Sequence, residues 1–162
     1  MTTYFKQFLG KFPVGLPPIT LSDDTHHVFS LENEPLSEKM IADFITKYEP
    51  KEIDEFTEYV PCFHLPKRND MVTLVYWKAG LMSYDYLIAT FSAKTSAMID
   101  KKVIAGTKVL DNKTVKRTIA VIGEDFSVTT AEGLEINTVF DAGNSVPHRY
   151  IISEDGFVEQ EY

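Results

Sequence analysis

The stretch MVTLVYWKAGLMSYDYLIATFSAKTSAMIDKKVIAG, residues 71–106, decides the fold of this chain. It contains three runs of β-branched and aromatic residues, at 71–78, 84–91 and 97–105, which are separated by turn-forming residues. Apolar side chains on both faces of the first run predict a central strand that is covered on two sides. The spacing of short runs and turns predicts antiparallel strands joined by hairpins.

Runs of the same kind continue to the C-terminus, at 115–122, 126–130, 134–140, 148–153 and 157–162. Asp155-Gly156 is a strong hairpin signal, and Glu132-Gly133 predicts another hairpin between its two flanking runs. We therefore predict an α+β fold dominated by an antiparallel β-meander of about eight strands. Because so many neighbouring strands curl, the sheet is expected to form a roll or an open barrel.

The N-terminal part is predicted to add two short helices. Residues 3–9 place aromatic side chains at helical spacing, and residues 37–48 carry an apolar stripe behind Ser37, a favourable N-cap. A short strand is expected at 28–31. A length of 162 residues favours a single domain, 1–162, in which the helical and extended segment 1–60 packs on the meander of 61–162.

The charge of the chain is strongly acidic and unevenly distributed. Its formal net charge is −8; segments 22–60 and 123–162 carry −8 each, whereas 61–122 carries +6. An acidic protein repels phosphate backbones, so nucleic acid is not an expected partner. No window reaches the roughly 18 apolar residues of a membrane span, and the N-terminus lacks a signal peptide. A cytoplasmic protein without a membrane partner is therefore expected, and its oligomeric state stays open.

An aromatic group on two neighbouring strands is the strongest candidate binding site. Its members are Tyr76, Trp77, Tyr84, Asp85 and Tyr86. Because neighbours along a strand alternate, Tyr84 and Tyr86 are expected to line one face with a residue of the preceding strand. Aromatic side chains on an exposed sheet face bind partners or small ligands. The alternative is that these rings fill the core, as aromatic residues in strands usually do.

Two polar clusters suggest other chemistry. Cys62 and His64 point to one face of an extended stretch, as a nucleophile with its base or half of a zinc site would. Cys62 is the only cysteine, so we expect a buried thiol beside a packed or surface histidine. His26 and His27 follow two aspartates, which we interpret as a solvated turn rather than a metal site.

No nucleotide-binding, hydrolase or zinc-protease motif occurs in the chain. We therefore expect no catalytic residues, no metal and no cofactor. This absence favours a non-enzymatic protein, although dispersed catalytic residues would escape such a search.

Two segments together resemble a known group of proteins. FKQFLGKFPVGLPPITL at 5–21 carries an F-P-x-x-L-P stretch, and YDYLIATFSAKTSAMIDKKVIAG at 84–106 carries an aromatic strand ending in Thr-Phe, a turn and an Ile-Asp strand. The combination resembles small β-rich proteins of Bacteroidetes with no assigned function, although the turn here lacks their usual glycine. The resemblance implies a bacterial β-rich module and no catalytic residues.

Charge and size favour a non-enzymatic interaction module of the immunity or adaptor type. An acidic patch is predicted to meet a basic protein partner, and its residues are Glu49, Glu52, Asp54, Glu55 and Glu58.

Two alternatives remain. One is a small-ligand binder or an enzyme with its site in the mouth of the curled sheet, in a pocket bordered by Tyr76, Tyr84, Asp85 and Tyr86. The other is a structural subunit that uses the edge strand 157–162 to build an oligomer.

Overall fold

A computed structural model describes residues 1–162 except 24, 50–55, 138 and 141–144, and except the side chain of residue 140. Three α-helices, one 3-10 helix and ten strands lie in the described part of the chain. The helices are α1 (Thr3–Leu9), α2 (His26–Glu32), α3 (Glu38–Phe44) and the 3-10 helix η1 (Thr46–Tyr48). The strands are β1 (Ile19–Leu21), β2 (Glu58–His64), β3 (Met71–Ala79), β4 (Ser83–Ser92), β5 (Met98–Val109), β6 (Thr114–Ile122), β7 (Ser127–Ile136), β8 (Val139–Phe140), β9 (Val146–Ile152) and β10 (Val158–Glu161).

All strands belong to one antiparallel sheet that does not close on itself. Its continuous path runs β10-β9-β7-β6-β5-β4-β3-β2, with β1 added beside β6 and β8 beside β7. Consecutive strands pair along most of this path, because hairpins join them. The predicted α+β meander is therefore confirmed, as a curled and open sheet with short helices.

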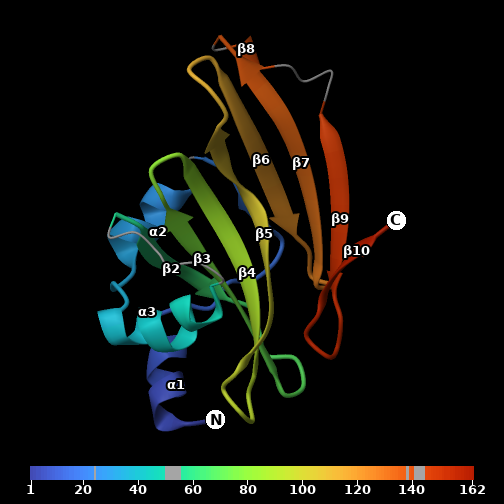
Figure 1. The fold of residues 1–162 in the computed structure, drawn as a ribbon. Helices are drawn as coiled ribbons and strands as arrows, with labels where there is room; N and C mark the ends of the chain where they lie inside the picture. The colour runs from blue at the N-terminus through green and yellow to red at the C-terminus, as the bar shows by residue number, and fades with distance from the viewer. Residues whose placement is uncertain (24, 50–55, 138, 141–144) are drawn as a thin grey trace.

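Strand β5 divides the sheet into two parts. It pairs with β4 along almost its whole length, but it pairs with β6 only at Gly106–Val109. The far half of β6 pairs instead with β1, part of an N-terminal strap that crosses the sheet. Figure 1 shows β5 running between the part formed by β2–β4, which carries the helices, and the part formed by β6–β10.

Two helices begin where the sequence predicts. The Thr2 hydroxyl accepts a hydrogen bond from the Phe5 amide at 3.1 Å, and the Ser37 hydroxyl accepts one from the Met40 amide at 3.1 Å. Each bond satisfies an amide that has no partner within its helix. The helix predicted over 37–48 breaks at Ile45 into α3 and η1.

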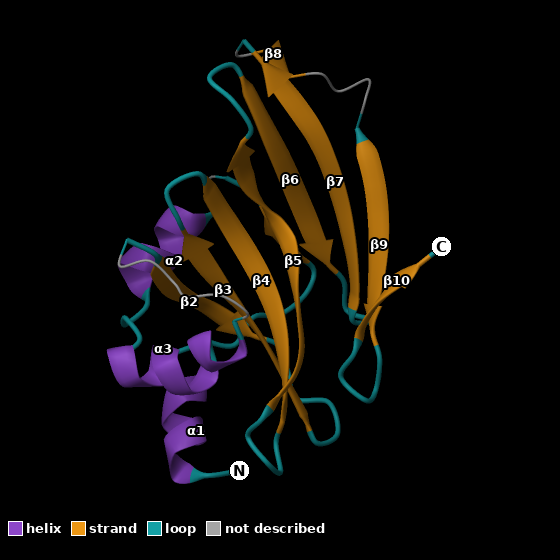
Figure 2. Ribbon diagram, viewed as in Figure 1, coloured by secondary structure: helices purple, strands orange, loops and turns teal. Residues whose placement is uncertain are grey.

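The strand predicted at 28–31 is wrong, because this segment lies within helix α2 (Figure 2). No residue of α2 is fully buried, and Phe29 is its one side chain that packs on a core cluster. The C-terminal end of α2 is held by the side-chain amide of Asn33, whose Nδ2 donates to the carbonyls of Pro61 and Cys62 at 2.7 and 3.0 Å. Tertiary contacts to β2, rather than local periodicity, decide this element.

The hairpin predicted at Glu132-Gly133 is also wrong. Strand β7 runs through this pair without interruption, and Gly133 lies opposite Arg117 of β6. The ladder to β6 runs through both residues, and the ladder to β9 reaches Glu132, so strand pairing outweighs the local turn preference. The hairpin predicted at Asp155-Gly156 is confirmed between β9 and β10, with Gly156 at a φ of +95°.

Two hydrophobic clusters form the core. The first places α1 and α3 on one face of β3 and β4, where the ring centres of Phe8 and Phe44 lie 4.6 Å apart and those of Phe5 and Phe91 lie 5.4 Å apart. The second contains side chains from both parts of the sheet and from β1. Within the described residues, no helix is long and apolar enough to cross a membrane.

Candidate functional site

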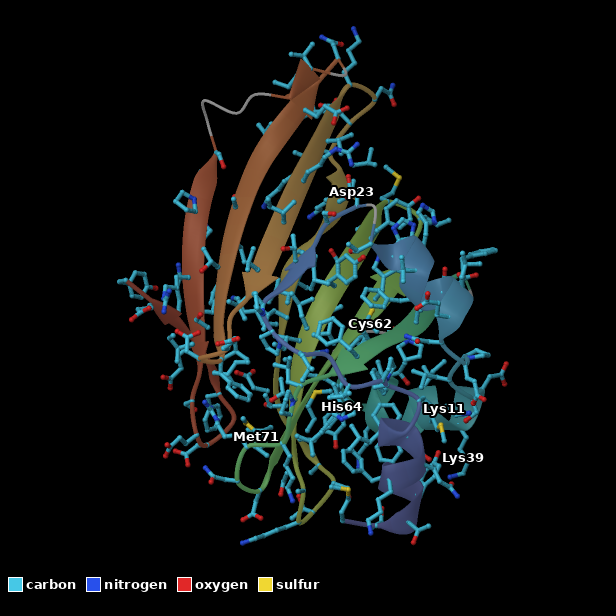
Figure 3. The ribbon with its side chains drawn as sticks, turned by 180° about the vertical axis from the view of Figure 1, so that it is seen from behind. Lys11, Asp23, Lys39, Cys62, His64 and Met71 are labelled. Atoms are coloured by element: carbon cyan, nitrogen blue, oxygen red, sulfur yellow. The ribbon has the colours of Figure 1, made fainter. Side chains whose placement is uncertain are left out.

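An aromatic cavity of about 360 Å³ lies where the N-terminal strap and α2 meet strands β3 to β6. Its lining residues are Asp23, His26, Trp77, Tyr84, Tyr86, Gly106, Thr107 and Arg117. Figure 3 shows Asp23 at the end of the strap, beside α2 and the sheet. The cavity therefore combines one wall from the N-terminal segment with a floor from the sheet.

Strand register builds the floor of the aromatic cavity. Tyr84 of β4, Thr107 of β5 and Arg117 of β6 form one row of directly opposed residues. Tyr86 lies opposite Trp77 of β3. Opposed residues in a sheet project from the same face, so these five side chains reach one side of the sheet.

Three rings form a continuous stack along this cavity. The imidazole of His26 lies 4.7 Å from the Trp77 ring at an interplanar angle of 12°, and Tyr84 lies 5.8 Å from Trp77 at 10°. His26 is the first residue of α2, and its Nδ1 lies 2.5 Å from the Asp23 carbonyl oxygen. Tyr84 keeps 43% of its surface exposed, so part of the stack is open to a ligand.

Tyr86 ties the strap to the sheet beneath the cavity. Its hydroxyl lies 2.7 Å from the Thr25 hydroxyl and donates to the Ser22 carbonyl at 3.3 Å. Burial raises the pKa of Tyr86 to about 12, although the Thr25 hydrogen bond opposes this shift. Tyr86 therefore stays protonated at neutral pH and fixes the strap by its hydrogen bonds.

The charged groups of the cavity pair with one another and leave a negative balance. The Arg117 Nε donates to Glu135 at 2.7 Å, and the Arg117 Nη1 donates to the Asp23 carboxylate. Thr107 also donates to the Asp23 carboxylate. One guanidinium therefore faces two carboxylates, so an anionic ligand would meet repulsion at this end of the cavity.

The structure divides the five predicted aromatic-group residues between two faces. Trp77, Tyr84 and Tyr86 line the aromatic cavity, but Tyr76 and Asp85 do not. Tyr76 is fully buried in the cluster beneath α1 and α3, and Asp85 projects from the face opposite Tyr84. A pocket bordered by both of them and the two tyrosines is therefore wrong, because adjacent strand residues alternate between faces.

Burial raises the pKa of Asp85, and the positive charges of Lys78 and Lys108 oppose this shift. A raised pKa means that the folded state binds the proton more tightly than the unfolded chain does. Protonated Asp85 therefore contributes its full stability at pH values below the pKa that it has in the unfolded chain. This contribution is lost as the pH rises through the pKa that Asp85 has in the folded protein. Ionised Asp85 therefore destabilises the fold at neutral pH.

We expect Asp85→Asn to raise the free energy of unfolding at pH 7, by less than about 1 kcal/mol because the site is partly solvated. Urea unfolding at pH 7 and below about pH 4 measures this, since wild type and variant converge where Asp85 is protonated. A variant that is less stable at pH 7 would contradict the assignment.

The predicted acidic patch is not a continuous surface in the described residues. The Glu49 side chain is only 9% exposed, and its carboxylate lies 3.2 Å from the Lys101 Nζ and 3.5 Å from the Lys78 Nζ. Glu58 is exposed at the start of β2. Glu52, Asp54 and Glu55 lie outside the described residues. The assignment of Glu49 to an exposed patch is corrected, because its charge is neutralised inside the protein.

Cys62 and His64 do not form a reactive pair. Cys62 is fully buried, and this burial raises the pKa of its thiol, so it resists forming the nucleophilic thiolate. The His64 Nδ1 lies 2.6 Å from the Phe12 carbonyl oxygen, which holds the ring against the strap. Within the part of the chain that the structure describes, no group of three or more His, Cys, Asp or Glu side chains could hold a metal ion.

Sequence reasoning missed the polar wall of the aromatic cavity. His26 was expected in a solvated turn, and Asp23, Thr107 and Arg117 carried no motif. The alternation along 115–122 indicates that Arg117 shares a face with Ile119 and Val121, but not which row of the sheet it joins. Neither a protein-family model, nor a curated protein, nor a solved structure matches this chain.

Proposed function

We propose that this protein binds a flat organic ligand in the aromatic cavity and acts without catalysing a reaction. The observation that carries this proposal is the stack of His26, Trp77 and Tyr84 along one wall, with part of Tyr84 exposed. Ligand sites are typically concave and aromatic, with a few polar groups that fix orientation. Asp23 and Thr107 supply such groups in the lining of the cavity.

The charge of the cavity favours a neutral or positively charged ligand. Asp23 and Glu135 both bind Arg117, so the guanidinium has little capacity left for an anion. The faces of aromatic rings carry negative electrostatic potential and attract cations. A flat cation therefore gains both stacking and electrostatic attraction, whereas a flat anion gains only stacking.

We prefer ligand binding to the two other hypotheses, an acidic protein-interaction module and a structural subunit of an oligomer. Of the two described members of the acidic patch, Glu58 is exposed, but Glu49 is enclosed by two lysines and adds no free charge for a basic partner. The strand β10 does lie at the edge of the sheet, with Phe157 half-exposed just before it. That edge is available for pairing with a second copy, but it does not line the aromatic cavity, which the oligomer hypothesis leaves unexplained.

Matched flat probes test the proposal. Isothermal titration calorimetry with N-methylquinolinium, quinoline and quinoline-2-carboxylate compares a cation, a neutral ring and an anion of similar shape. We expect the cation to bind most tightly and the carboxylate most weakly. Trp77 is the only tryptophan, so quenching of its fluorescence gives a second readout located in the cavity. Equal affinity for all three probes, or no binding, would refute the proposal.

We expect Tyr84→Ala to weaken N-methylquinolinium binding by about tenfold or more, because a stacked cation–aromatic contact contributes about 1–2 kcal/mol. Tyr84 is partly exposed, so the variant is expected to fold. Tyr162→Ala is the matched control, since Tyr162 is fully exposed at the C-terminus, away from the cavity lining. Similar losses in both variants would show that the probe binds elsewhere.

A further inference from the structure

A second cavity, the polar trough, lies on the other face of the strands that floor the aromatic cavity. Its volume is about 410 Å³, and β4 to β7 and β9 contribute to its lining. Its charged and polar side chains include Ser83, Asp85, Lys108, Lys116, Glu132 and His148. Tyr84, Thr107 and Arg117 reach the first cavity, and their strand neighbours reach the trough, so the two sites share one wall.

Strand register again explains the arrangement. Asp85, Gly106, Thr118 and Glu132 lie directly opposite one another across β4, β5, β6 and β7. Gly106 has no side chain, so it leaves space above the sheet in the middle of this row, between the carboxylates of Asp85 and Glu132 at its two ends. Lys108 and Lys116 form the next row of opposed residues.

One acid and one base in the trough have no ion-pair partner among the described residues. Lys116 pairs with Glu132 at 3.1 Å, so these two charges satisfy each other. Asp85 lies opposite Lys78, whose ammonium lies 3.5 Å from the Glu49 carboxylate and acts on Asp85 only through its charge. Among the described residues, neither Asp85 nor Lys108 forms a salt bridge, although the charge of Lys108 acts on Asp85.

We propose that the polar trough binds a zwitterionic small molecule of the amino-acid type. Its ammonium group would bind the Asp85 carboxylate, and its carboxylate would bind Lys108, with Lys116 beside it. Ser83, Thr118 and His148 line the same cavity and offer hydrogen bonds to the rest of the ligand.

Other ligand classes fit this charge arrangement less well. An anion would approach Asp85, and a cation would approach Lys108 and Lys116, so each meets at least one like charge. An uncharged polyol would desolvate Asp85 and Lys108 without supplying an opposite charge to either. A zwitterion supplies both charges. Its ammonium and carboxylate groups lie a short distance apart, as do Asp85 and Lys108 on the neighbouring strands β4 and β5.

Thermal-shift and calorimetric titrations with each of the standard L-amino acids test this proposal. At about 10 mM, an amino acid with a submillimolar Kd raises the melting temperature measurably. For the best binder, the decarboxylated amine and the deaminated acid serve as matched probes. We expect each to bind at least about tenfold more weakly, since each loses one charged contact. If no amino acid stabilises the protein, or if either analogue binds equally well, the proposal is overturned.

Substitutions of residues that line the polar trough test whether the amino acid binds there. We expect Asp85→Asn and Lys108→Gln each to weaken amino-acid binding by about tenfold or more, with the fold retained. Lys113→Gln is the matched control, because Lys113 is an exposed lysine in the β5–β6 turn. Tyr84→Ala is expected to leave amino-acid binding unchanged, so the outcome is separable from that of the aromatic cavity. Unchanged affinity in Asp85→Asn would place the ligand elsewhere and overturn the assignment.

Discussion

Gly106→Ala is expected to lower the free energy of unfolding by about 3–5 kcal/mol, the largest effect that we predict for a single substitution. A Cβ at Gly106 would lie 2.1 Å from the Tyr84 carbonyl oxygen and 3.0 Å from the Asp85 Cα. Both are backbone atoms, so no rotation of a side chain relieves the clash. The φ of +146° at Gly106 adds strain, since residues with a Cβ rarely adopt it.

The same substitution is expected to weaken ligand binding in both cavities. Tyr84 stacks in the aromatic cavity and Asp85 lines the polar trough, and the clash displaces the backbone of both residues. Urea unfolding measures the stability, and titration with N-methylquinolinium measures the change at the aromatic cavity.

Gly80→Ala is the matched control for this prediction. The nearest atom to a Cβ at Gly80 is the Ser83 carbonyl oxygen at 3.6 Å, an ordinary contact. We expect its free energy of unfolding to change by about 1 kcal/mol or less. If Gly106→Ala were as stable as Gly80→Ala, β5 would not approach β4 as closely as this register requires.

Glu49→Ala is expected to lower the free energy of unfolding by about 2–4 kcal/mol, because it leaves the ammonium groups of Lys78 and Lys101 without their counter-charge. Both lysines are about one-quarter exposed, so partial contact with water limits the loss. Lys78 lies on β3 and Lys101 on β5, so Glu49 connects the end of η1 to two strands. Chemical unfolding at pH 7 measures the effect.

Glu58→Ala is the control, since Glu58 is an exposed acid of the same predicted patch. Its effect is expected to stay within about 0.5 kcal/mol. A double-mutant cycle of Glu49→Ala with Lys101→Met isolates the coupling between the two charges. Equal stability of Glu49→Ala and Glu58→Ala would show that Glu49 is solvated, and would return it to the acidic surface.

Local chemistry explains why much of the fold is predictable. The runs at 71–78 and 84–91 alternate or stay apolar over enough residues that no other element fits them. Thr2 and Ser37 cap helices through their own hydroxyls, and Asp155-Gly156 forms its turn from two adjacent residues. Each of these features depends only on residues within a few positions of it, so the local sequence is enough to predict it.

The errors lie where distant contacts outweigh local preference. Residues 28–31 form a helix held by Asn33 against β2, and Gly133 stays within a strand because it pairs with Arg117 of β6. The alternation of side chains along a strand places Tyr84 and Asp85 on opposite faces of the sheet. Which face is covered depends on where α1 and α3 pack. That packing buries Tyr76 and leaves Trp77 in the aromatic cavity.

The sequence by itself determined an acidic, antiparallel β-meander with short helices and an aromatic group on two adjacent strands. Only the tertiary structure decided which of these residues line one cavity, because register across β4, β5 and β6 brings Tyr84, Thr107 and Arg117 into one row. It also decided that the Lys78 ammonium lies beside Glu49 and that Asp85 forms no salt bridge among the described residues. Strand pairing and charge pairing join residues far apart in the chain, and local sequence patterns do not specify such partners.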